Sequence, residues 1–105
     1  MIHLAVRRVN PELLEIFRKW MAQLNGPRHD EALATLVDEG CSHELVGLIE
    51  GPDGPLVIYA MEVESIEKSS EAAHYSAHQI DKDHRAVIDR AIGERLSLEK
   101  ILDLH

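Results

Sequence analysis

Residues 56–63, Leu-Val-Ile-Tyr-Ala-Met-Glu-Val, decide which fold this sequence can adopt. Branched and aromatic side chains fill this short stretch, and turn residues precede it, which predicts a β-strand. Because successive side chains of a strand point to opposite faces, both faces of this strand are mainly apolar. One face carries Leu56, Ile58 and Ala60, and the other carries Val57, Tyr59, Met61 and Val63.

Another strand is expected directly before this one. The intervening stretch, Gly51-Pro52-Asp53-Gly54-Pro55, is dense in turn residues, and residues 41–50 have the pattern of a strand. Two strands joined by a short loop rich in glycine and proline form a hairpin. His43 and Glu44 are adjacent on the earlier strand and therefore point to opposite faces, but their pattern does not indicate which of them faces inward.

The chain before the hairpin predicts a strand followed by a broken helix. Residues 2–9 alternate with period two, as in a strand. Asn10 and Pro11 suit the start of a helix, whose apolar face continues to Leu24. Gly26 is a natural left-handed cap for it. A second helix is expected over about 27–39, closed by Gly40.

The chain after the hairpin repeats this arrangement. The expected elements are a helix over 66–75 capped by Ser65, a break over 76–81, a helix over 81–92 and a weakly alternating strand over 96–104. The order strand, broken helix, strand, strand, broken helix, strand is the ferredoxin-like βαββαβ pattern. We therefore expect residues 1–105 to form one α+β domain with a four-stranded antiparallel sheet.

The two apolar faces of residues 56–63 predict a dimer. Helices in this topology cover one face of the sheet, and monomers rarely expose a large apolar patch. A second copy of the sheet, packed about 10 Å away, is the simplest cover. Two sheets packed back to back form a dimeric α+β barrel, so we expect a homodimer.

Charge and composition exclude several classes of partner. The formal net charge is −8, with 19 acidic and 11 basic residues, so the chain repels phosphate backbones and anionic lipid. We expect no nucleic-acid partner and no membrane partner. The single cysteine, Cys41, forms no internal disulfide and is expected to be a small buried side chain. Arg7 and Arg8 interrupt any apolar leader, so we expect a cytoplasmic protein.

Several short stretches together resemble a known family. They are the run from Asp30 to Gly40, His43-Glu44, Tyr59-Ala60-Met61, and His78-Gln79-Ile80-Asp81 with His84-Arg85. This combination resembles a family of small uncharacterised bacterial proteins. Gln79 departs from the family pattern, which has proline after the histidine. The resemblance implies the same dimeric α+β barrel fold, shared by a wider superfamily of monooxygenases, haem-handling proteins, isomerases and cyclases, and it implies no activity.

Histidine spacing offers one candidate metal site. The chain has seven histidines, and His74 and His78 are four residues apart, so a continuous helix would place both on one face. His84 lies six residues further on and is the candidate third ligand. A surface or helix-capping role for His74 and His78 is the more ordinary interpretation. No sequence feature names a cofactor.

Acid–base chemistry is the other candidate. His84 lies on the apolar face of the last helix, where a histidine is more often a core residue than a general acid or base. Asp81, one turn earlier, is a candidate for fixing its tautomer. His84, His78 and Tyr59 are therefore the candidate catalytic residues, with Tyr59 placed on a face that would line a barrel interior.

Candidate ligand-binding residues lie on the first two helices. Arg28 could hold a carboxylate or pair with Glu31, and Glu31 at a helix start is also explained by the helix dipole. Trp20 lies on the helix face that meets the sheet, where core packing is the leading interpretation. Three functions follow: a small-molecule enzyme using histidine and tyrosine, a metal- or haem-binding protein using His78 and His84, or a non-catalytic ligand-binding or interaction domain.

Overall fold

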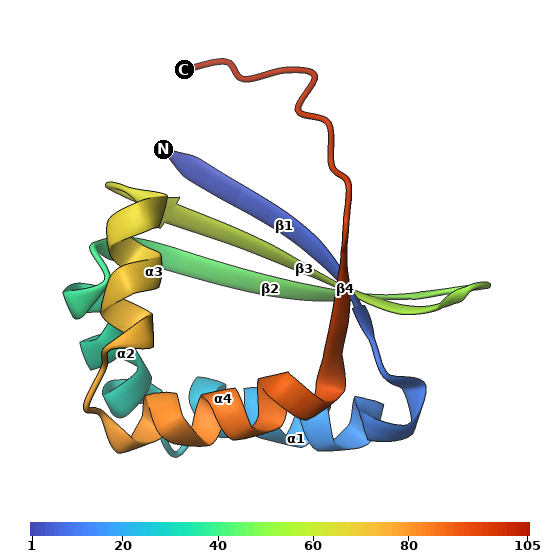
Figure 1. Cartoon of the computed structure of the whole chain (residues 1–105), viewed down its shortest axis with the longest axis horizontal. Coiled ribbons are helices and arrows are strands. Elements are labelled where there is room, and N and C mark those ends of the chain that lie inside the picture. The colour runs from blue at the N-terminus through green and yellow to red at the C-terminus, as the bar shows by residue number, and fades with distance from the viewer.

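A computed structural model describes residues 1–105 and contains four strands and four α-helices in one α+β arrangement (Figure 1). The elements are β1 (Ile2–Val9), the 3-10 turn η1 (Pro11–Leu13), α1 (Leu14–Asn25), α2 (His29–Asp38), β2 (Cys41–Gly51), β3 (Gly54–Val63), α3 (Ile66–His74), α4 (Gln79–Ala91) and β4 (Ile92–Leu96). The predicted hairpin, the two broken helices and the antiparallel four-stranded sheet are confirmed. No helix is long and apolar enough to cross a membrane.

The sheet has the strand order β2-β3-β1-β4, and every neighbouring pair is antiparallel. The register places Tyr59 of β3 opposite Ala5 of β1 on one side and Val46 of β2 on the other. Directly opposed residues share a face of the sheet, so these three side chains point the same way. This register determines which residues meet the helices.

The helices cover one face of the sheet. Phe17 of α1, Ala91 at the end of α4 and Ile92 pack with Val9 and Val57, and this cluster forms the buried core. Val57 is completely buried. Burial of each valine, isoleucine or phenylalanine side chain in this cluster stabilises the fold by roughly 1.5–3 kcal/mol. Figure 1 shows α1 and α4 along one side of the strands, with α2 and α3 closing one end.

The opposite face of the sheet, called the open face below, has no cover from this chain. The register assigns to it the apolar side chains Ile2, Leu4, Val6, Leu45, Ile49, Leu56, Ile58, Ala60 and Leu96. Leu45 is 63% exposed and Ile2 is 57% exposed. The sequence prediction that β3 has two apolar faces, of which the helices cover only one, is confirmed.

Local chemistry explains where the helices begin. The Asn10 side chain accepts a hydrogen bond from the backbone N–H of Glu12, and the Ser65 hydroxyl accepts one from the N–H of Lys68. Both predicted caps are thereby confirmed. Gly40 ends α2 with φ +63°, as expected for a left-handed cap. The same prediction for Gly26 is wrong, because its φ is −132°.

The last strand begins earlier than predicted. We expected a helix to about residue 92 and a strand over 96–104, whereas α4 ends at Ala91 and β4 covers Ile92–Leu96. Ile92 is buried against the core and is already extended, because it pairs with Val9 of β1. Residues 97–105 form no regular structure and run beyond the sheet on the side away from α1 and α4 (Figure 1).

Candidate functional site

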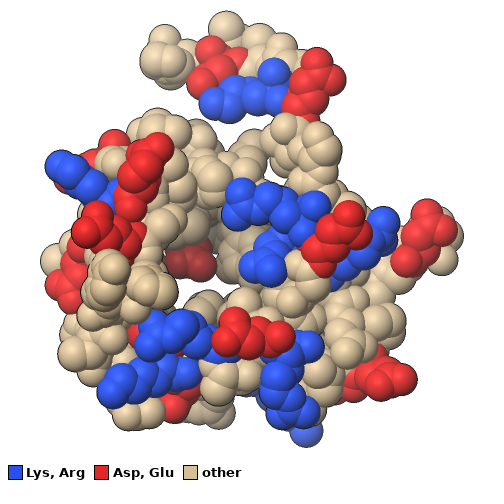
Figure 2. All heavy atoms as spheres, viewed as in Figure 1, with Lys and Arg blue, Asp and Glu red and all other residues tan.

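A cleft of about 580 Å³ lies between α1, α2, β2 and the first turns of α4. Eleven of its twenty lining residues are hydrophobic, which is typical of a site for a small organic molecule. Its apolar wall includes Phe17, Met21, Leu24, Leu36, Leu48 and Ile80. Figure 2 shows the molecule hollowed between its helices and its sheet, with acidic side-chain atoms set back inside.

Three carboxyl groups line this cleft and none of them forms an ion pair. They are Glu39 after α2, Glu44 on β2 and Asp81 on α4. Burial first, and then the nearby charges of Glu44, Asp81 and Asp38, together raise the pKa of Glu39 to about 7. Burial also raises the pKa of Glu44, although part of its side chain reaches solvent. The one arginine in the wall, Arg18, is engaged by Glu15 and Glu50 outside it.

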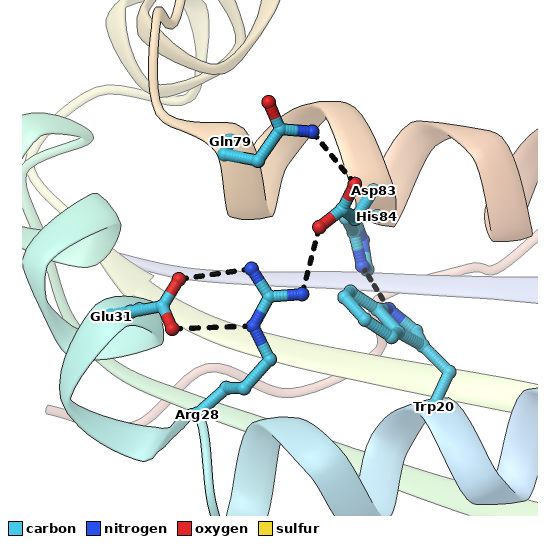
Figure 3. Close-up of polar contacts among 6 residues, drawn as sticks. All are labelled: Trp20, Arg28, Glu31, Gln79, Asp83 and His84. Atoms are coloured by element: carbon cyan, nitrogen blue, oxygen red, sulfur yellow. Dashed lines mark hydrogen bonds and ion pairs between the residues drawn. The ribbon is translucent and has the colours of Figure 1, made fainter.

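Two histidines line the cleft, the exposed His29 and the half-buried His84. The Nδ1 of His84 accepts a hydrogen bond of 2.8 Å from the indole N–H of Trp20 (Figure 3). A ring nitrogen that accepts a hydrogen bond carries no proton, so the proton of the neutral ring lies on Nε2. Burial lowers the pKa of His84, Arg85 adds to this effect, and the carboxylate of Asp81 opposes it. His84 is therefore a neutral imidazole with a defined tautomer.

A clamp centred on Arg28 holds the helices that carry Trp20 and His84. The Arg28 guanidinium donates to both carboxylate oxygens of Glu31, at 2.9 and 3.3 Å, and to Asp83 on α4 at 2.8 Å. Its Cζ lies 5.5 Å from the centre of the Trp20 ring, within cation–π range. Figure 3 shows Arg28 between the two carboxylates, with Gln79 donating to Asp83.

The clamp decides between the two predictions for Arg28. The expected pairing of Arg28 with Glu31 is confirmed, and its hydrogen bonds lower the pKa of the carboxyl groups of Glu31 and Asp83. A bidentate pair leaves the donors of the guanidinium engaged within the protein. Arg28 and Glu31 therefore position the wall of the cleft, and neither is among the residues that line it.

A family comparison bears on the whole chain. The model of a family of unknown function, DUF6176, matches residues 2–105. The chain belongs to the DUF6176 family. A search of curated proteins found no match. Membership in DUF6176, a family of unknown function, assigns no chemistry to the cleft.

Two of the candidate catalytic residues lie away from the cleft of this DUF6176 chain. His78 is at the surface, where its Nε2 lies 2.7 Å from the Asp38 carboxylate. Tyr59 faces the helices and packs against the core cluster, and burial raises its pKa to about 12. A phenol with that pKa is poorly matched to proton transfer near neutral pH. Neither residue lines the cleft with His84.

The three histidines of the candidate metal site have separate neighbours. α3 ends at His74 and α4 begins at Gln79, so the continuous helix that the metal site required does not form. His74 is exposed and meets the ring of Tyr75 edge-on, with centroids 4.7 Å apart. No group of three or more histidine, cysteine, aspartate or glutamate side chains is placed to hold a metal ion. The metal hypothesis has no geometric support here.

Some residues of the cleft were not found from the sequence. Asp81 was the expected partner of His84, whereas the hydrogen bond to its Nδ1 comes from Trp20. Glu44 points toward the helices and His43 toward the open face, a choice that the sequence left undecided. Nothing in the sequence marks Glu39 as a functional residue, because a glutamate just before a helix-ending glycine usually lies on the surface. Cys41 is buried as predicted, and burial raises the pKa of its thiol.

Proposed function

We propose that the cleft binds a small organic molecule with an apolar body and a basic or hydrogen-bond-donating group, and that His84 and Glu39 exchange protons with it. The observation that carries the proposal is the unpaired carboxyl groups of Glu39 and Glu44 in a mainly apolar cleft. A ligand cation inside the cleft would offset the cost of ionising them. A ligand anion would add to their repulsion.

The two titrating groups suit proton transfer near neutral pH. With a pKa of about 7, Glu39 is divided between its acid and its carboxylate at pH 7, so it can give or take a proton. Neutral His84 offers an N–H at Nε2, while Trp20 holds Nδ1. In this proposal Glu39 and Glu44 replace His78 and Tyr59 as the partners of His84.

A titration of labelled protein with a panel of small amphipathic amines tests the proposal. Two-dimensional NMR at pH 7 should show shifts at Glu39, Glu44, Trp20 and His84, and matched carboxylic acids should give none. Glu44→Gln should weaken binding about tenfold. The neutral glutamine cannot make the charge–charge interaction between the Glu44 carboxylate and the ligand ammonium group, which contributes about 1.4 kcal/mol. The matched control is Glu71→Gln, an exposed glutamate on α3 outside the cleft.

The outcomes separate the alternatives. Shifts with the amines at the cleft residues and at Trp20, which contacts His84, would support the proposal. Turnover of an amine that disappears in His84→Gln would show that the protein is an enzyme. Binding of the amines without turnover of any of them by the native protein would favour a non-catalytic ligand-binding domain. Equal response to amines and acids, or shifts only outside the cleft, would overturn the proposed ligand class.

We also propose the finer fold and assembly. The strand order β2-β3-β1-β4 with two helical crossovers supports a ferredoxin-like domain. The apolar open face supports a homodimer built as a dimeric α+β barrel, with two sheets packed face to face. The single buried cysteine agrees with a cytoplasmic location. The acidic net charge argues against nucleic acid and membranes as partners.

A further inference from the structure

Two apolar surfaces of this chain have no neighbour within it. One is the open face, where Leu45 and Ile49 are 63% and 45% exposed. The other is the C-terminal segment, defined as residues 97–105. The apolar side chains in its second half are more exposed still, with Ile101 at 85% and Leu104 at 83%. Exposed leucine and isoleucine side chains gathered in this way mark an interaction site.

The C-terminal segment runs out on the same side as the open face. It leaves β4 and continues beyond the strands, opposite α1 and α4 (Figure 1). β4 pairs only with the second half of β1, between Val6 and Val9, so β4 leaves the outer edge of β1 without a partner over residues 2–5. An unpaired strand edge is a further place for another chain to dock.

The segment is poorly suited to folding back on its own sheet. Residues 97–105 read Ser-Leu-Glu-Lys-Ile-Leu-Asp-Leu-His and contain no glycine, proline or asparagine. The turn-forming residues that it does contain, Ser97 and Asp103, lie near its two ends, so its middle has none of the residues that favour a tight reversal. The segment instead stands away from the sheet, where only another molecule can cover its apolar side chains.

The area of the sheet favours a contact that includes the segment. Four strands about 4.8 Å apart and eight residues long, at about 3.3 Å per residue, give a face of roughly 500 Å². A stable interface buries about 800 Å² on each partner. The nine residues of the segment extend to about 30 Å and can span such a face. Sheet and segment together reach the size that a stable dimer needs.

The charges on this side allow two identical copies to approach. The centre of the open face has no charged side chain. At one end the Met1 amino group pairs with Glu62 at 3.1 Å, and at the other Arg8 lies 3.7 Å from Glu94. The net charge of −8 is therefore carried mainly by other surfaces. A second copy of this chain fits such a neutral apolar face better than a charged partner does.

We infer that the C-terminal segment of each copy crosses to a second copy and packs on its open face, so that the two chains exchange their ends. The inference rests on the proposed homodimer and adds the segment that holds it together. It also gives a role to the leucines and isoleucine of residues 97–105, which contribute nothing to the core of their own chain.

Sedimentation of the 105-residue chain tests the inference. The native protein should sediment as two chains of 11.8 kDa each at micromolar concentration. Replacing Ile101 and Leu104 together by serine should raise the dimer dissociation constant at least tenfold without loss of helical circular dichroism. The matched control replaces Glu99 and Lys100 by serine, which removes no apolar side chain and leaves the net charge unchanged. It should alter the dissociation constant less than twofold.

Isotope-filtered NMR on a mixed dimer then locates the segment. In a dimer of one labelled and one unlabelled chain, we expect signals that report proximity between chains. They should connect the methyl groups of Leu102 and Leu104 of one chain with methyl groups on the open face of the other. A monomeric native protein would overturn both the dimer and the exchange. A dimer unaffected by the double serine variant, or segment contacts only within one chain, would overturn the exchange and leave the dimer standing.

Discussion

Glu39 is the residue whose ionisation the fold alters most usefully. Burial raises its pKa to about 7 from an ordinary value of 4.5. Between these two pH values the folded protein keeps a proton that the unfolded chain has lost. The free energy of unfolding contributed by Glu39 therefore falls as the pH rises through this window. At pH 8 the ionised carboxylate is a cost to the fold.

Replacing Glu39 by glutamine should remove this cost. We expect Glu39→Gln to stabilise the protein at pH 8 by about 1–2 kcal/mol and to change little at pH 4, where both states are protonated. Urea unfolding at the two pH values measures the difference. Glu71→Gln, an exposed carboxyl on α3, should show no such pH dependence. A variant that tracks the native protein at both pH values would show that Glu39 ionises normally.

Trp20 controls His84, and the pair gives a second prediction. The indole N–H stabilises the neutral ring by donating to Nδ1, so Trp20→Phe should raise the pKa of His84 toward 6.5. It should also leave both neutral tautomers populated. A pH titration of the imidazole nitrogens by NMR reads both effects. The control is Tyr75→Phe, whose ring contacts His74 instead.

The lowered pKa of His84 should also make the free energy of unfolding depend on pH. Because burial lowers the folded pKa of His84, its neutral form is fully stabilising above the unfolded value of 6.5. That stability is lost as the pH falls below 6.5, and Trp20→Phe should weaken the loss. A His84 pKa that does not move in Trp20→Phe would remove the tautomer-fixing role of the indole.

At the scale of elements, two glycines make a matched pair. Gly40 ends α2 at φ +63°, and a Cβ there would lie 3.4 Å from the Glu64 carboxylate. Gly47 lies in β2 with no atom within 4 Å of an added Cβ and without a positive φ. We expect Gly40→Ala to destabilise by about 1 kcal/mol or more and Gly47→Ala to be neutral or slightly stabilising.

Urea unfolding of the two alanine variants under one set of conditions checks this. Equal losses in the free energy of unfolding would mean that alanine adopts the left-handed conformation at position 40 without strain. The explanation of how α2 ends would then be wrong. The comparison matters for function because Glu39 precedes Gly40, so this turn places the carboxyl group in the cleft.

At the scale of the whole molecule, net charge opposes the proposed association. Two chains of charge −8 repel each other at low ionic strength, whereas the apolar contact does not depend on screening. The dimer dissociation constant should therefore fall severalfold when sodium chloride rises from about 20 to 300 mM, where the Debye length shortens from about 20 to 6 Å. Sedimentation measures this directly. A dissociation constant that rises with salt would indicate a contact held by ion pairs.

Local patterns in the sequence determined the elements of this fold. The alternation of residues 2–9, the turn residues of 51–55 and the two apolar faces of 56–63 are properties of short stretches, and each forms as predicted. The caps at Asn10 and Ser65 are equally local. Strand and helix periodicity depends on backbone geometry within a few residues, which a single sequence displays.

Only the tertiary structure decided the candidate site. The strand register shifts between Cys41 and His43, and this irregularity cannot be counted from alternation alone, so the face of Glu44 was undetermined. The pKa of Glu39 is raised first by burial in the cleft, and then by the charges of Glu44 and Asp81, which approach it from β2 and α4. Likewise the Trp20 indole reaches His84 across 64 positions in the chain. Burial and charge depend on groups that are distant in sequence, and folding alone brings them together.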